Sequence, residues 1–155
     1  MSAAPASPPV SVHASAVVIG ETGVLIRGAS GSGKSSLADA LILEAAQRGQ
    51  FGRLIGDDRI RLACAGGRIM ARPHPAIAGQ IERRGIGIVS VPGEAAVVVR
   101  LVADILPDEA PQPARLPESP DASAAISGVV LPRVCLLAAH SVQEQARRIF
   151  NALGY

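Results

Sequence analysis

Aromatic residues are nearly absent from this 155-residue chain: they make up 2% of it, and tryptophan does not occur. A core must therefore be built from aliphatic side chains, which the 48% hydrophobic content supplies. The net charge of only +2 and the lack of aromatic side chains for base stacking disfavour a nucleic-acid-binding protein. No charge-free apolar run reaches the roughly 18 residues of a membrane-spanning helix, so we expect no membrane contact.

Cysteine is equally sparse, because Cys64 and Cys135 stand far apart and without the spacing of a metal site. Buried or idle thiols of this kind are typical of the reducing cytoplasm, where we expect the protein to reside. Residues 1–9 contain no basic segment followed by an apolar one, and they predict a disordered tail in place of a signal peptide. Residues 10–155 have the length of a single domain.

One segment carries a specific signal. Residues 28–35 read GASGSGKS and satisfy the phosphate-loop (Walker A) pattern G-x-x-x-x-G-K-[ST] at every fixed position. An apolar run at 23–27 precedes the loop, and apolar residues at helical spacing follow over 36–46. The loop backbone can then surround an anion, Lys34 can reach the β- and γ-phosphates, and the Ser35 hydroxyl can bind Mg²⁺. The predicted nucleotide contacts are Gly28, Ser30, Gly31, Ser32, Gly33, Lys34, Ser35 and Ser36.

Short strands dominate the rest of the chain. A second helix is predicted over 141–153, with Ser141 and Glu144 as a capping box and Arg147–Arg148 on its solvated face. Pro132 predicts an edge position or a break in the last strand. Because strands and helices do not alternate, the pattern favours an α/β P-loop domain rich in short strands over a regular Rossmann-like fold. Strands are expected at 10–19, 23–27, 53–56, 59–63, 68–71, 86–91, 95–101 and 129–138.

Asp57 and Asp58 follow one of these short strands. Phosphoryl transfer to a hydroxyl needs a carboxylate near the acceptor and carboxylates near Mg²⁺. Adjacent side chains at a strand end point in different directions, so one aspartate can serve each task, with Asp57 toward the metal. A surface Asp–Asp turn is the alternative explanation.

Further candidates stand elsewhere in the chain. Glu82 suits a metal and Arg84 a phosphate, although an exposed, ion-pairing strand edge explains the same spacing. His13 reaches the nucleotide end of the sheet if its strand pairs with the one that enters the loop. Arg115 lies in the proline-rich segment 107–120, and an arginine on a loop can close over a transferring phosphate.

Taken together, four segments resemble the catalytic domain of HPr kinase/phosphorylase, a family that phosphorylates a seryl residue of the phosphocarrier protein HPr. The most specific segment, IERRGIGIVSV at 81–91, is similar to the family signature of Glu, any residue, Arg-Gly and an alternating apolar–glycine strand. The other three segments are His13-Ala14, the loop at 28–35 and Asp57-Asp58-Arg59.

The resemblance implies roles for these residues. Asp58 would take the seryl proton in the kinase direction, and would protonate the departing serine when inorganic phosphate attacks phosphoserine to give pyrophosphate. Ser35 and Glu82 would hold Mg²⁺, together with Asp57 as argued above. The implied catalytic residues are Asp58, His13, Lys34, Arg84 and Arg115.

The resemblance also implies a fold related to the nucleotide-binding domain of phosphoenolpyruvate carboxykinase, an HPr-type partner and a hexameric assembly. Segments that the family uses for docking, regulation and assembly are short here, at 92–94 and 131–134, or missing. We therefore expect a short form with the catalytic domain only, in which kinase activity carries over more safely than phosphorylase activity. Two alternatives stay open: a small-metabolite kinase and a non-catalytic ATP-binding regulatory module.

Overall fold

The structure is a computed structural model that describes residues 8–108 and 123–155. Most of the expected tail, most of the proline-rich segment and Arg115 lie outside the described residues. The elements are β1 (Val10–Val12), β2 (Ala14–Ile19), β3 (Thr22–Gly28), α1 (Lys34–Gln47), β4 (Gly52–Gly56), β5 (Ile60–Ala65), β6 (Arg68–Pro73), the 3₁₀ turn η1 (Pro75–Ile77), β7 (Gln80–Arg83), β8 (Gly87–Ser90), β9 (Val97–Leu106), β10 (Ser123–Ile126), β11 (Val129–Leu137) and α2 (Val142–Ala152).

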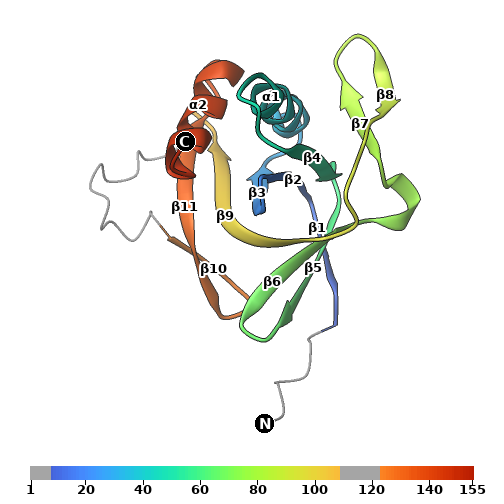
Figure 1. The fold of residues 1–155 in the computed structure, drawn as a ribbon, viewed down its shortest axis with the longest axis vertical. Helices are drawn as coiled ribbons and strands as arrows, with labels where there is room; N and C mark the ends of the chain where they lie inside the picture. Colours follow the sequence, from blue (N-terminus) through green and yellow to red (C-terminus); the bar gives the residue numbers. More distant parts are fainter. Residues whose placement is uncertain (1–7, 109–122) are drawn as a thin grey trace.

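A curled sheet forms the body of the molecule, with strand order β1-β5-β6-β9-β3-β2-β4 and with β11 pairing both β9 and β10 (Figure 1). The pairs β3–β9 and β9–β11 are parallel, and the remaining pairs are antiparallel. Helices α1 and α2 lie together on one side of the sheet (Figure 1). Strands β7 and β8 form a separate hairpin that projects beside α1 and carries the signature segment.

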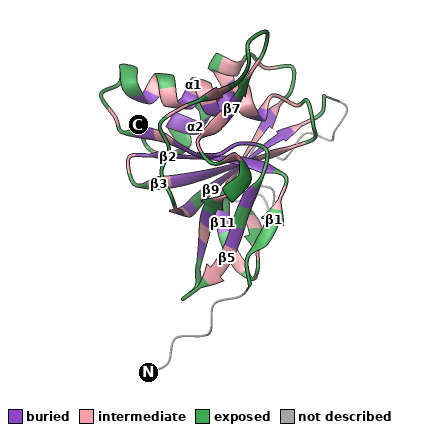
Figure 2. Cartoon of the chain, turned by 90° about the vertical axis from the view of Figure 1, so that its right-hand side faces the viewer, coloured by how far each residue is buried: buried purple, intermediate pink, exposed green. Residues whose placement is uncertain are grey.

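Two apolar clusters fill the two faces of the sheet. Because side chains alternate along a strand, Val24 and Ile26 of β3 pack toward the helices, while Leu25 packs on the opposite face. All three side chains are fully buried, and the central strands are buried along most of their length (Figure 2). Strand β3 is thus held on both faces, which fixes the point where the phosphate loop leaves the sheet.

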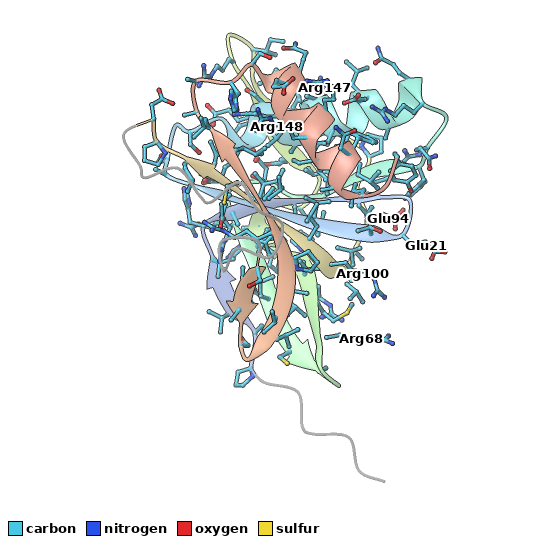
Figure 3. All side chains as sticks on the ribbon, turned by 90° about the vertical axis from the view of Figure 1, so that its left-hand side faces the viewer. Glu21, Arg68, Glu94, Arg100, Arg147 and Arg148 are labelled. Carbon is cyan, nitrogen blue, oxygen red and sulfur yellow. The ribbon has the colours of Figure 1, made fainter. Side chains whose placement is uncertain are left out.

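The strand-rich α/β fold is confirmed, and so are the hairpins β2–β3 and β5–β6 and the capping of α2 by Ser141, whose hydroxyl accepts from the Glu144 amide. Arg147 and Arg148 lie on α2 (Figure 3), and both pair with Glu144. The strand expected at 10–19 is interrupted at His13. Pro132 lies where β11 changes partners from β10 to β9, which agrees with an edge position.

Strands β7 and β10 were not predicted from the sequence. Each has only four residues, and the charged Glu82-Arg83 pair of β7 hides a pattern in which Ile81 alone enters the core. No helix among the described residues is long and apolar enough to cross a membrane.

Candidate active site

The phosphate loop joins the end of β3 to the start of α1. Gly31 and Gly33 have φ angles of +79° and +105°, a backbone conformation that side chains other than glycine rarely adopt. A Cβ added at either residue would meet nothing within 4 Å, so there is open space beside the loop at both positions. Gly33 caps α1 without a side-chain hydrogen bond, and the first turn contains no acidic residue. The first amides of α1 are therefore available to an anion.

Lys34 lies across this loop. Its Nζ donates to the carbonyl oxygens of Gly28 at 2.9 Å and Ala29 at 3.0 Å. Burial lowers the pKa of the Lys34 ammonium group, and the charges of Asp58 and Asp57 oppose that effect. The ammonium group can reach a bound phosphate by exchanging two neutral carbonyl partners for charged oxygens.

Asp57, at the end of β4, points into the protein and is buried. Its Oδ1 accepts hydrogen bonds from the hydroxyls of Ser15 and Ser35, both at 2.7 Å. Its Oδ2 accepts from the Ser35 hydroxyl at 2.8 Å and from the Glu82 amide at 3.2 Å. One carboxylate thus joins β2, the start of α1 and the β7–β8 hairpin.

Asp58 points the other way, into the open pocket. Its φ of +66° is unusual for a residue other than glycine, and its amide donates to the Ser15 hydroxyl at 3.2 Å. Its Oδ1 lies 3.2 Å from Nδ1 of His13, and both side chains are about half exposed. The two adjacent side chains therefore point in different directions, as expected, and the tasks assigned to them stay predictions.

A pocket of about 230 Å³ brings together most of the residues singled out from the sequence. Gly28 and Ser32 are the predicted nucleotide contacts that do not line it, and Asp57, expected at the metal, does not line it either. The Ser32 hydroxyl is buried without a hydrogen-bond partner among the described residues, and a Cβ on Gly28 would come within 2.5 Å of it. These two residues shape the loop from behind. The lining residues are His13, Ser30, Gly31, Gly33, Lys34, Ser35, Ser36, Asp58, Glu82 and Arg84.

The β7–β8 hairpin supplies Glu82 and Arg84 to the pocket. Between them, Arg83 points away and forms two hydrogen bonds with Asp39 of α1, from Nε at 3.1 Å and from Nη2 at 3.0 Å. Because α1 also carries Ser35, this pair ties the hairpin to the helix that follows the phosphate loop.

The oxygen donors fit a magnesium ion only in part. Among residues 8–108 and 123–155, no three His, Cys, Asp or Glu side chains cluster as a ready metal site. Mg²⁺ is normally held by one or two carboxylates, substrate phosphates and water, and does not need a full protein cage. The Ser35 hydroxyl with Asp57 behind it, and Glu82 across the pocket, match that smaller donor set.

Two features of the site region escaped sequence reasoning. Ser15 is fully buried, and it is the group that links Asp57 to the Asp58 backbone. Asp104 of β9 accepts two hydrogen bonds from Arg27, the residue before the loop, and another from Arg133 of β11. Burial acts to raise the pKa of Asp104, but the two arginines outweigh burial and lower it. In the sequence, the only sign of either feature is that Ser15 and Asp104 are polar residues within mostly apolar strands.

The loop, the strand that feeds it and the helix that follows define a P-loop nucleotide-binding domain. The family model described as HPr Serine kinase C-terminal domain matches residues 5–98, and the chain belongs to that family. Its fold is similar to the Hpr(Ser) kinase/phosphatase from Coxiella burnetii, with a TM-score of 0.73, 25% identity and coverage of 94% of this chain and 99% of the other.

Curated relatives agree with this assignment. An HPr kinase/phosphorylase from Mycoplasma mycoides is 44% identical over 86 residues, which are 55% of this chain and 25% of the relative. One from Treponema pallidum is 36% identical over 87 residues, again 55% of this chain and 25% of the relative. The matched region spans about a quarter of the length of these relatives.

Proposed function

We propose that this domain transfers the γ-phosphoryl group of ATP to a seryl hydroxyl of an HPr-type phosphocarrier protein. The observation that carries the proposal is the position of Asp58, which faces the same pocket as the phosphate loop with His13 at 3.2 Å. A carboxylate exposed beside a phosphate loop suits an acceptor hydroxyl, and the relatives named above carry the name HPr kinase/phosphorylase.

The reaction requires one proton transfer and one exchange of P–O bonds. The seryl oxygen attacks the γ-phosphorus, the bond to the β–γ bridging oxygen breaks, and Asp58 accepts the seryl proton. His13 orients the Asp58 carboxylate and shares the proton. Lys34, Arg84 and the loop amides neutralise the charge that develops on the transferring group.

Mg²⁺, when bound with the nucleotide, neutralises phosphate charge and aligns the γ-phosphoryl group. The Ser35 hydroxyl and Glu82 would hold it, while Asp57 accepts a hydrogen bond from the Ser35 hydroxyl on the side away from the pocket. In that arrangement Asp57 orients a metal ligand, and Asp58 remains free for the acceptor.

Under the same proposal, these residues also catalyse the reverse reaction, the phosphorolysis of phosphoseryl HPr. An oxygen of inorganic phosphate attacks the phosphoseryl phosphorus, the bond to the serine oxygen breaks, and Asp58 returns a proton to the serine, which yields pyrophosphate. Under this proposal residues 10–155 act as one catalytic domain, located in the cytoplasm and assembled as a homo-oligomer of the kind found in the family.

The test is phosphate transfer from γ-labelled Mg-ATP to HPr of the same organism, beside an HPr whose acceptor serine is alanine. Label on the wild-type partner alone supports the proposal. Labelling of small metabolites in its place favours a metabolite kinase, and ATP binding without turnover favours a regulatory module; either result overturns the proposal.

The variant Asp58→Asn tests whether Asp58 is the base. It should reduce transfer at least about 100-fold, because the acceptor loses its base, while the affinity for ATP changes little. Equilibrium binding of a labelled ATP analogue provides the control. Transfer at the normal rate by this variant would contradict the assignment of the base.

A further inference from the structure

Two isoleucines on the β7–β8 hairpin are unusually exposed. Ile86 and Ile88 are 73% and 71% exposed, although a folded domain gains by burying side chains of this size. Ile88 is the residue directly opposite Glu82 in the antiparallel register. Residues that are opposite in register share a face, so Ile88 lies on the face of the hairpin that carries Glu82.

The other face of the hairpin has a different task. Ile81 is buried in the helix-side core, and its register partner Val89 packs against the same cluster. That face therefore attaches the hairpin to the domain. The face of Ile88 contributes nothing to that attachment, and its apolar character needs another explanation.

A small depression of about 130 Å³ lies beside β7 and β8, and Ile88 borders it. Asp58, Glu82, Ile77 and Ile88 line it, and the remaining lining residues are Asp57, Gln80 and Ile81. Asp58 and Glu82 also line the nucleotide pocket. Asp58 and Glu82 thus border both hollows, the one beside the phosphate loop and the one that Ile77 and Ile88 line.

This division constrains how an acceptor can approach. In-line transfer requires the hydroxyl to face the γ-phosphate from the side away from the leaving group. The phosphate loop and Asp58 line the same pocket. The acceptor chain must therefore approach Asp58 from the side of the second depression. Consecutive Cα atoms lie 3.8 Å apart. A residue next to the accepting serine must therefore contact the protein surface beside Asp58.

We propose that Ile77 and Ile88 form the apolar part of the acceptor site, and that they receive an aliphatic side chain adjacent to the phosphorylated serine of the partner. This inference rests on the proposed function. It adds a requirement for the acceptor sequence: a serine with an aliphatic neighbour, bound at the face where Ile88 lies opposite Glu82.

The test compares Ile88→Ser with Val130→Ser. Val130 is 70% exposed and lies on β11, in the β10–β11 hairpin at the far end of the molecule from β7 and β8 (Figure 1), so it controls for loss of an exposed aliphatic side chain. We expect Ile88→Ser to raise the KM for HPr about tenfold, with kcat and the KM for ATP changed less than about twofold. Ile88→Thr, which keeps the branching that strands favour, should fall between the wild type and the serine variant.

The partner side of the contact is tested with HPr variants in which each aliphatic residue adjacent to the acceptor serine is changed to serine. One of them should raise the KM for the wild-type enzyme and cause no further rise with Ile88→Ser. Absence of transfer by the wild-type enzyme would overturn the proposed function and this inference together. Normal transfer with an Ile88→Ser variant that behaves like Val130→Ser, or with effects that multiply, overturns this inference alone.

Discussion

Asp104→Asn tests the ion cluster under the phosphate loop. The Asp104 side chain is only 9% exposed, whereas those of Arg27 and Arg133 are 38% and 19% exposed. Removing one partner of a fully buried pair costs about 3–5 kcal/mol. Water can reach part of both arginines once the Asp104 charge is removed. We therefore expect a smaller loss, about 2–3 kcal/mol in the free energy of unfolding. For a domain of this size that corresponds to a fall in Tm of roughly 4–12 °C.

The pH dependence follows from the direction of the shift. Arg27 and Arg133 hold the pKa of Asp104 below its ordinary value of 3.8 in the folded protein. The carboxylate thus contributes stability that is complete above about pH 4 and is lost as the pH falls through the lower, folded pKa. The difference between wild type and Asp104→Asn should therefore be constant between pH 5 and 8 and shrink below pH 4.

Urea unfolding at a series of pH values measures this difference directly. Glu144→Gln is the matched control, because Glu144 also pairs with two arginines and has a lowered pKa, but lies on the surface of α2. It should change stability much less at every pH. Equal stabilities of wild type and Asp104→Asn at pH 7, or a difference that persists in full below pH 3, would refute the reasoning.

Four further variants test the residues that hold the site in place. Ser15→Ala should cost about 1–3 kcal/mol in urea unfolding and lower kcat, because buried Asp57 loses a donor. Arg83→Gln should change stability by less than about 1 kcal/mol but raise the Mg²⁺ concentration for half-maximal activity, as should Asp39→Asn, because the hairpin loses its tie to α1. Gly23→Ala should cost about 1–3 kcal/mol in urea unfolding with kcat retained, since its Cβ would lie 2.5 Å from a carbonyl oxygen of β9.

The parts of the fold that the sequence predicts are those encoded by near neighbours. The phosphate loop, its flanking strand and helix, and the cap of α2 each depend on residues within one turn or one hairpin of each other. Local geometry was enough for these features, and no knowledge of the remaining chain was needed. Asp57 and Asp58 point in different directions as predicted, although they lie beyond the end of β4 and Asp58 has a positive φ, so strand alternation is not the cause.

The rest depends on pairs that are distant in sequence. Ser15 lies 42 residues before its partner Asp57, and Arg27 lies 77 residues before Asp104. A single sequence does not indicate which strands become neighbours, so neither pair was visible before the sheet order was known. Strand β7 was hidden for a related reason, because its assignment depends on pairing with β8 and on one core contact from Ile81.

Asp57 and Asp58 are adjacent in the chain, but one carboxylate is buried and the other is exposed. Asp57 is buried and bound by three donors, so its position depends on β2, α1 and the hairpin together. Asp58 shares the Ser15 hydroxyl through its amide, which transmits that fixed position to a side chain that is itself more than half exposed. The proposed function requires a base that an acceptor protein can reach and a rigid residue that orients the metal ligand. Under the proposed function, Asp57 is the rigid residue that orients the metal ligand Ser35, and through Ser15 it fixes the backbone of Asp58, the proposed base.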